Sequence, residues 1–166
     1  MENPVSQDGA AKRGEGGEII IRPAASGDAQ RMWEIDQICF DPGIAYPIDF
    51  IYYHLLVLRD PAFCVWDGET IVGFVLTSLE KPAEGCIVTL DILDPYRRRG
   101  LGGRLIGMAE RALADRGARK IVLQAAVENE RAMAFYGKHG YVRGRLLKNY
   151  YGKKKDAWQY HKLPNK

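Results

Sequence analysis

The sequence predicts an α/β domain of the α+β class, in which a mixed, mostly antiparallel central sheet carries helices on both faces. Three observations predict it. Short apolar runs bounded by turn residues fill residues 62–93, helix-spaced apolar residues follow over 101–116, and strands alternate with a helix over 120–163. Strands joined by short turns pair antiparallel, whereas a strand, helix and strand in succession form a crossover to a parallel strand.

Length and composition predict one ordinary globular domain. The chain has 166 residues, of which 46% are hydrophobic and 27% charged, with a net charge of +3. Residues 1–17 are rich in Gly, Ala and charged groups without periodicity, so they are expected to form a disordered tail before a single domain at 18–166. No apolar run approaches the roughly 18 residues of a membrane span, and residues 1–17 are not expected to be a secretory signal, because they contain no apolar stretch.

The three cysteines are scattered, which predicts neither a disulfide framework nor a metal site. Reduced thiols suit a cytoplasmic protein, and that is the expected location.

The first elements are predicted from residue type and period. The β-branched run Glu18–Ile21 indicates a strand. Residues 26–40 read as a helix whose apolar stripe consists of Met32, Ile35, Ile38 and Cys39. A second helix is expected over 48–58, and it must end before Pro61.

The middle of the chain is predicted to be an antiparallel meander. Its strands are the apolar runs 62–66, 70–78 and 86–93. Asp67-Gly68 is a strong hairpin-turn signal between the first two, and residues 81–85 form the expected loop before the third.

The second half is predicted to contain a helix at 101–116, a strand at 120–126, a helix from 129 to 138, and strands at 141–147 and 157–163. Gly117 and Gly140 are suited to end the two helices, and Asn129 is suited to cap the start of the second.

The start of the 101–116 helix has an unusual composition. Three arginines, Arg97, Arg98 and Arg99, precede Gly100, and no capping side chain is present. Each positive charge beside the positive helix end costs about 0.3–1 kcal/mol, unless an anion binds the exposed N–H groups. The alternative is a solvated basic loop with glycines for flexibility.

Two motifs add to this. The first runs from Ile87 to Gly102 and contains Arg-x-x-Gly-x-Gly at the start of a helix. The second is Asn129-x-x-Ala-x-x-x-Tyr136-x-x-x-Gly140-Tyr141. Together they resemble the two signatures of the GCN5-related N-acetyltransferase (GNAT) superfamily, over about residues 18–163. Residues 89–93 and 147–152 are similar to those of N-terminal protein acetyltransferases, both the RimI-like branch and the Nα-acetyltransferase catalytic subunits.

The resemblance implies acetyl-CoA (coenzyme A) as the cofactor. The backbone of residues 90–92 would hold the pantetheine arm, residues 98–103 would cradle the pyrophosphate, and Tyr136 would protonate the departing thiolate. Without the motif, Tyr136 is better interpreted as a core aromatic, whereas capping the helix is an equally good role for Asn129. The residues implied to bind the cofactor are Leu90, Asp91, Ile92, Arg97, Arg98, Arg99, Gly100, Leu101, Gly102, Gly103, Asn129 and Tyr136.

The acceptor side is predicted to involve Tyr46, Tyr150 and Tyr151, with Tyr46 in the loop between the first two helices. The position of Gln124 holds the catalytic base, a Glu or His, in relatives, and Cys86 stands where some of them place a catalytic tyrosine. A glutamine accepts no proton at pH 7. Gln124 is therefore expected to act by positioning a water that relays the proton outward, towards Glu128.

Without a strong base the site should favour an amine that is easily deprotonated. An α-amine has a pKa near ~7.7–8.0, and a lysine side chain near ~10.4, a difference worth about 3.4 kcal/mol. The predicted function is acetyl-CoA-dependent acetylation of the N-terminal α-amine of a protein or peptide, by direct attack on the thioester.

Two alternatives remain open: a small-molecule amine as acceptor, or an acyl-CoA-binding protein without activity. Nucleic-acid binding, suggested by the basic clusters 97–99 and 153–155, is a weaker reading, so neither a nucleic acid nor a membrane is expected as partner. The sequence does not give the oligomeric state.

Overall fold

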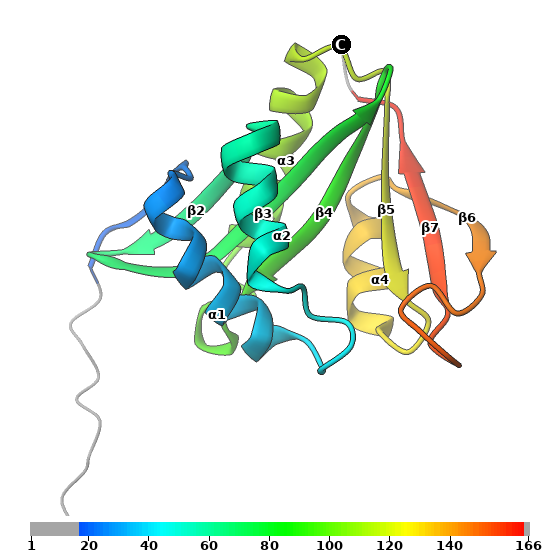
Figure 1. Cartoon of the computed structure of the whole chain (residues 1–166), viewed down its shortest axis with the longest axis horizontal. Helices are drawn as coiled ribbons and strands as arrows, with labels where there is room; N and C mark the ends of the chain where they lie inside the picture. Colours follow the sequence, from blue (N-terminus) through cyan, green and yellow to red (C-terminus); the bar gives the residue numbers. More distant parts are fainter. Residues whose placement is uncertain (1–16, 165–166) are drawn as a thin grey trace, which may run out of the picture.

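The predicted sheet is present in full. The computed structural model describes residues 17–164, so the predicted disorder of residues 1–16 lies outside the described residues. Seven strands form one sheet in the order β1-β2-β3-β4-β5-β7-β6, in which only β4 and β5 pair in parallel (Figure 1). The strands are β1 (Ile19–Pro23), β2 (Ala62–Asp67), β3 (Thr70–Lys81), β4 (Glu84–Ile92), β5 (Lys120–Ala126), β6 (Val142–Leu147) and β7 (Ala157–Lys162).

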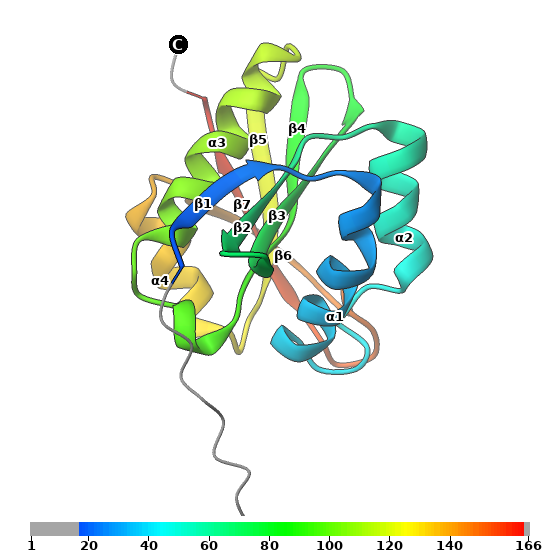
Figure 2. The same cartoon turned by 90° about the vertical axis from the view of Figure 1, so that its left-hand side faces the viewer.

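Helices cover both faces of this sheet, as predicted. Figure 2 shows α1 and α2 on one face, with α3 and α4 on the other. The long helices are α1 (Ala29–Cys39), α3 (Leu101–Asp115) and α4 (Glu130–Lys138); the shorter segments are η1 (Ser26–Asp28), α2 (Ile48–Tyr52), the π-helical η2 (Tyr53–Leu58) and η3 (Asp94–Tyr96).

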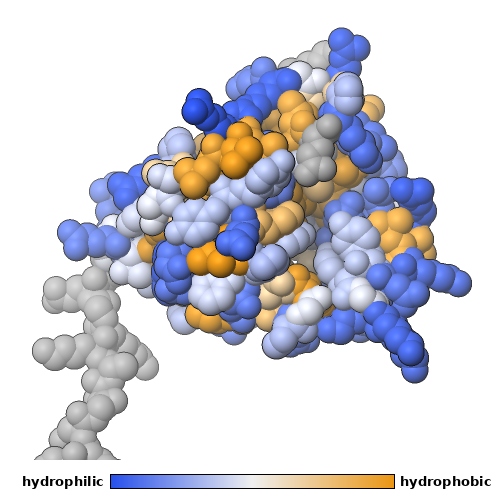
Figure 3. All heavy atoms as spheres, viewed as in Figure 1, coloured by the Kyte–Doolittle hydropathy of each residue, from blue (hydrophilic) through white to orange (hydrophobic). Residues whose placement is uncertain are grey.

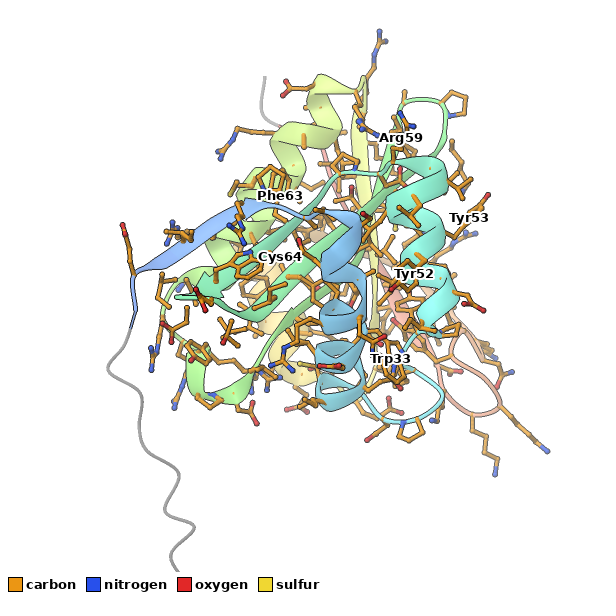
Figure 4. All side chains as sticks on the ribbon, turned by 60° about the vertical axis from the view of Figure 1, so that its left-hand side comes forward. Trp33, Tyr52, Tyr53, Arg59, Phe63 and Cys64 are labelled. Carbon is orange, nitrogen blue, oxygen red and sulfur yellow. The ribbon has the colours of Figure 1, made fainter. Side chains whose placement is uncertain are left out.

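Alternation along the strands divides the core into two layers. Val65 and Val75 belong to the layer beneath α3 and α4, whereas Cys64 and Phe74 belong to the layer beneath α1 and α2. Trp33 on α1 and Tyr52 on α2 border the second layer (Figure 4). Both faces of the sheet are therefore apolar, and each needs its own helix pair.

One detail of α1 was predicted wrongly. Ile38 is 66% exposed, whereas Asp36 is fully buried. At 100° per residue, Ile38 lies about 120° around the helix from the buried Met32, while Asp36 lies about 40° from it. The helix period therefore directs an acidic side chain, and not the isoleucine, towards the sheet.

The loop predicted over residues 81–85 is shorter than expected. β3 extends to Lys81 and β4 begins at Glu84, so Pro82 and Ala83 alone form the turn, with Ala83 at a φ of +60°. The strand pair β3–β4 is correspondingly longer than the apolar runs indicated.

The parallel pair β4–β5 is incomplete, and this shapes the molecule. Only residues 84–86 of β4 pair with β5, at residues 120–122; beyond them the two strands diverge (Figure 1). The divergence begins at a β-bulge. Thr77 opposes Ile87 and Leu76 opposes Thr89, which leaves Val88 as the extra residue of β4. Because a bulge bends and twists its strand, β4 turns away from β5 at this point.

Figure 3 shows apolar residues on the outer surface of the α2–η2 segment, where Leu56 and Val57 are exposed. Within residues 17–164, no helix combines the length and the apolar character needed to cross a bilayer.

Candidate active site

Two adjoining cavities, of about 680 and 610 Å³, lie along the diverging strands. The larger, the arginine cavity, borders the start of α3, and the smaller, the tyrosine cavity, borders the loops after α1 and β6. Leu90, Asn129 and Tyr136 line both. The cavities are therefore two ends of one channel between β4 and β5.

The start of α3 is open to the arginine cavity. Gly100, which lines the cavity, is the N-cap residue with a φ of +77°, and no side chain caps the helix. A Cβ at Gly100 would meet no atom within 4 Å, so the glycine is required for its left-handed backbone and not for space. The N–H groups of the first turn have no intrahelical acceptor and are available to an anion.

The three arginines before this helix point to different places. Arg97 and Arg98 line the cavity, and Arg97 also pairs with Asp94. The guanidinium of Arg99 lies 5.2 Å from the ring centre of Tyr96 and is outside the lining. Leu101 is outside it as well, since its side chain is buried in the core. Of the predicted cofactor residues, Arg99 and Leu101 alone lack a place in the lining; the others line it.

The glycines that follow have a packing role that the sequence did not indicate. A Cβ at Gly102 would lie 3.1 Å from two ring carbons of Phe135, and one at Gly103 would lie 2.9 Å from Nε2 of His139. Helices α3 and α4 thus touch at the cavity, which Phe135 and His139 both line. Paired glycines signal a close approach, but they do not identify the partner.

Sequence reasoning also missed two cations of α4. Arg131 and Lys138 line the arginine cavity together with Arg97 and Arg98. Single basic residues on a helix carry no signal of their own, because most lie on solvated faces.

Both α4 residues of the second motif lie where the cavities adjoin. The Oδ1 atom of Asn129 accepts a hydrogen bond from the Ala132 N–H at 3.0 Å, so Asn129 caps the helix while lining the channel. Tyr136 is nine-tenths buried. Burial, followed by the nearby Asp91 carboxyl, raises the pKa of the Tyr136 phenol above its usual value.

The tyrosine cavity contains two of the three predicted acceptor-side tyrosines. The Tyr46 hydroxyl donates to the carbonyl of the bulged Val88 at 3.4 Å, and the Tyr151 hydroxyl donates to the Gln124 carbonyl at 3.3 Å. Burial raises the pKa of both phenols, so both remain protonated donors. Tyr150 is 46% exposed and packs edge-on against Tyr151, outside the lining.

Gln124 lies on β5 and lines the tyrosine cavity, and its side chain accepts a hydrogen bond from Cys86. The Cys86 thiol donates to Gln124 Oε1 at 3.9 Å, so the two positions at which sequence reasoning noted a missing catalytic group contact each other. The acidic residues in the cavity lining are Asp41 and Glu128. At the mouth, Lys155 Nζ donates to the Pro42 carbonyl at 3.4 Å, which joins the loop after β6 to the loop after α1.

Comparison with known proteins now decides the family. The model of the Acetyltransferase (GNAT) family matches residues 29–141. The chain belongs to this family. The fold and the family expected from the two motifs are thereby confirmed, and so is an enzyme of the N-acetyltransferase type.

Relatives and solved structures agree with this assignment. N-alpha-acetyltransferase 30 of Schizosaccharomyces pombe is 32% identical over 128 residues, which cover 74% of this chain and 85% of that protein. N-alpha-acetyltransferase MAK3 of Arabidopsis thaliana is 28% identical over 124 residues, covering 72% of this chain and 65% of that protein. The structure of Ard1 from Thermoplasma volcanium superposes with a TM-score of 0.81 at 21% identity, covering 89% of this chain and 99% of that one.

The contact between α3 and α4 predicts opposite effects for two glycine substitutions in one helix. Gly107→Ala adds a Cβ whose nearest neighbour is 4.0 Å away, so it should stabilise the fold by about 0.5–1 kcal/mol through helix propensity. Gly102→Ala drives a Cβ into the Phe135 ring and should destabilise the fold by about 1–3 kcal/mol. Urea unfolding of the two variants measures both values. Equal stabilisation by both would contradict the close packing.

Proposed function

We propose that the chain is an acetyl-CoA-dependent N-acetyltransferase whose acceptor is the N-terminal α-amine of a protein or peptide. The observation that carries this is the single channel between β4 and β5, with an uncapped, arginine-flanked helix start at one end and a tyrosine-lined cavity at the other. Relatives named as N-alpha-acetyltransferases support the acceptor class.

The arginine cavity suits the pyrophosphate of coenzyme A. Its lining combines the open N–H groups at Gly100 with the cationic side chains of Arg98, Arg131 and Lys138. These features stabilise an anion together, because the helix end and the side chains all present positive charge. Arg97 contributes less, since it is already paired with Asp94.

The unpaired edge of β4 suits the pantetheine arm. From Ile87 onwards no strand pairs with β4 on its β5 side. The Val88 and Ile92 carbonyls already accept from Tyr46 and Arg97, so the backbone groups of Leu90, which lies between them and lines both cavities, are the ones available to the amides of the arm. Bound there, acetyl-CoA supplies the thioester carbonyl that the amine attacks and the thiolate that departs. An N–H group of the β4 edge would stabilise the charge that develops on the carbonyl oxygen.

Tyr136 acts as a donor towards the departing sulfur. Because its pKa is raised, the phenol keeps its proton in the free enzyme and cannot serve as the base. The same dry surroundings disfavour a free thiolate, which strengthens its demand for a hydrogen bond or proton from Tyr136.

The acceptor amine enters through the tyrosine cavity. Tyr46 and Tyr151 line it, with Gln124 behind them and Glu128 at its side. An α-amine is partly neutral near pH 7, so water and Glu128 are sufficient to remove its proton, whereas a lysine side chain is about 2.5 pKa units less favourable.

Cys39, Cys64 and Cys86 form no disulfide within the described residues, which supports a reducing, cytoplasmic setting for the enzyme.

The acceptor proposal predicts a strong preference among peptides. A peptide with a free N-terminus and no lysine should release coenzyme A with a kcat/KM at least about a hundredfold above that of its N-blocked, lysine-containing counterpart, from the difference in amine pKa. A thiol-reactive dye follows turnover on both peptides and on polyamines and amino acids. Turnover on the small amines alone would assign the enzyme a small-molecule acceptor. Tight coenzyme A binding with no turnover on any amine would make the chain a binding protein.

The cavity lining predicts that adjacent arginines differ. Arg98→Ala removes a charge from the arginine cavity and should weaken coenzyme A binding about tenfold, as expected for a lost charge-assisted hydrogen bond. Arg99→Ala removes a charge that rests on Tyr96 and should weaken binding about twofold or less. Isothermal titration calorimetry with coenzyme A compares the two. Equal losses would show that both arginines contact the cofactor.

Removal of the Tyr136 hydroxyl should affect chemistry and not cofactor binding. Tyr136→Phe retains the buried ring and should lower kcat about tenfold to a thousandfold, with the coenzyme A dissociation constant within about twofold of wild type. The matched control is Tyr160→Phe, which alters a buried core tyrosine outside both cavity linings. A Tyr136→Phe variant with wild-type kcat would remove the phenol from the mechanism.

A further inference from the structure

Two acidic side chains meet in the core beside the channel. Asp36 projects from α1 towards the sheet and is fully buried, and Asp91 on β4 is 1% exposed. Nothing in their roles as predicted from sequence explains this, because Asp36 received no role and Asp91 only a backbone one. A buried carboxylate pair is costly unless the charge is reduced or compensated.

The hydrogen bonds account for half of the four carboxyl oxygens. Asp36 Oδ2 accepts the backbone N–H of Tyr46 at 2.7 Å. Asp91 Oδ1 accepts the Thr89 hydroxyl at 2.9 Å. The other two, Asp36 Oδ1 and Asp91 Oδ2, are buried and receive no donor from other described groups.

Asp36 Oδ1 and Asp91 Oδ2 can form a hydrogen bond with each other only if one of the two carboxyl groups carries a proton. An ionised carboxyl has no hydrogen to donate, so two carboxylates cannot satisfy one another. Helix α1 packs on this part of β4, where the Cys39 thiol donates to the Ile92 carbonyl at 3.7 Å. A proton held by Asp91 would let it donate to Asp36, and this interaction raises the pKa of Asp91 while opposing the rise that burial causes at Asp36.

The charged and titratable groups around the pair favour this state. Arg97, from the segment after β4, is the cation that acts on Asp91, and the Cys39 thiol of α1 and the Tyr136 phenol of α4 also interact electrostatically with Asp91. Arg97 is also paired with Asp94, so it cannot compensate two further negative charges on Asp36 and Asp91. Burial accordingly raises the pKa of Asp36 to about 6 and that of Asp91 well above its usual range.

The pair connects the acceptor end of the channel to the donor strand. On one side, Asp36 fixes the backbone of Tyr46, whose ring stacks on Phe50 at 4.4 Å and whose hydroxyl reaches the bulge at Val88. On the other side, Asp91 belongs to the β4 segment that lines the arginine cavity. A hydrogen bond between the two carboxyl groups would thus tie the loop after α1 to the strand along which the thioester would lie.

We infer that Asp36 and Asp91 share one proton in the folded enzyme and act as positioning residues, holding Tyr46 at the acceptor cavity. The assignment of Tyr46 to the acceptor rests on the proposed function; the shared proton does not. Loss of the proton places two negative charges side by side, which breaks the bond and releases the Tyr46 loop. Acceptor binding should then weaken at alkaline pH, where deprotonation of the amine by itself would increase the rate.

Infrared spectroscopy tests the shared proton without reference to activity. The full-length protein at pH 7 should show the carbonyl stretch of a protonated carboxylic acid, and Asp91→Asn should remove it. Asp115→Asn, at an exposed position on α3, is the matched control and should leave the band in place. Absence of the band from the wild-type protein, or its persistence in Asp91→Asn, would overturn the inference.

Stability against pH gives a second readout. An acid whose pKa is raised on folding binds more protons in the folded state, so its stabilising effect is complete below the unfolded pKa of about 4 and is lost as pH rises through the folded value. The wild-type protein should therefore lose unfolding free energy, relative to Asp91→Asn, as the pH rises from about 4 towards the raised pKa of Asp91, because the asparagine has no proton to lose. Parallel pH curves for the two proteins would contradict a buried shared proton.

Kinetics test the positioning role. Asp36→Ala should raise the peptide KM about tenfold, the cost of one buried hydrogen bond, with coenzyme A affinity changed far less. Asp36→Asn should restore a low KM, because its amide can donate to Asp91 while its oxygen still accepts from the Tyr46 N–H. It should also abolish the alkaline rise in KM. If Asp36→Ala does not fold, Asp36→Asn still tests the positioning role, because an alkaline rise in its peptide KM equal to that of wild type would contradict it.

The outcomes separate the two proposals. A wild-type enzyme that acetylates no peptide, yet shows the infrared band and the pH-dependent stability difference, would refute the proposed function and leave the proton pair standing. Peptide acetylation with an Asp36→Ala KM equal to wild type would refute the positioning role alone.

Discussion

The early end of pairing between β4 and β5 is the constraint on which the rest of the structure depends. Parallel neighbours normally hydrogen-bond along their whole length, because buried backbone groups without partners are costly. Here pairing ends after residues 84–86 of β4, and the bulge at Val88 turns the strand away. The exposed backbone, the two cavities and the position of α4 across the opening all follow from that separation.

The sequence predicted the elements well because the signals for them are local. The strand at Lys120–Ala126 and the cap at Asn129 appear where the apolar pattern and the capping rule placed them. The separation of β4 from β5 was not predictable in this way, since it depends on register between strands far apart in the chain. The exposed Ile38 is a smaller case of the same kind. It was predicted to be buried from its hydrophobicity alone, whereas its position around the helix directs it to solvent.

The candidate site was predicted in outline, through motifs that fix residue types at fixed spacings. What the motifs did not give is the direction of each side chain. Arg98 adopts a φ of +58°, and the Arg99 guanidinium lies over the Tyr96 ring. As a result the two neighbouring arginines point in different directions, and only Arg98 lines the cavity. The Asp36–Asp91 pair was beyond sequence reasoning, because an acid on a helix reads as solvent-facing until the helix is known to pack on β4.

The contact between Gly102 and Phe135 has a consequence for how such an enzyme diversifies. Helix α3 and the helix that carries Tyr136 touch through Gly102 and the Phe135 ring, which would have to shift by a few tenths of an ångström to admit even a methyl group. A substitution that changed coenzyme A binding by enlarging residue 102 would also displace the Tyr136 phenol. Cofactor binding at the start of α3 and the position of the Tyr136 phenol are therefore coupled. A larger residue at position 102 should be accompanied by a smaller residue at position 135.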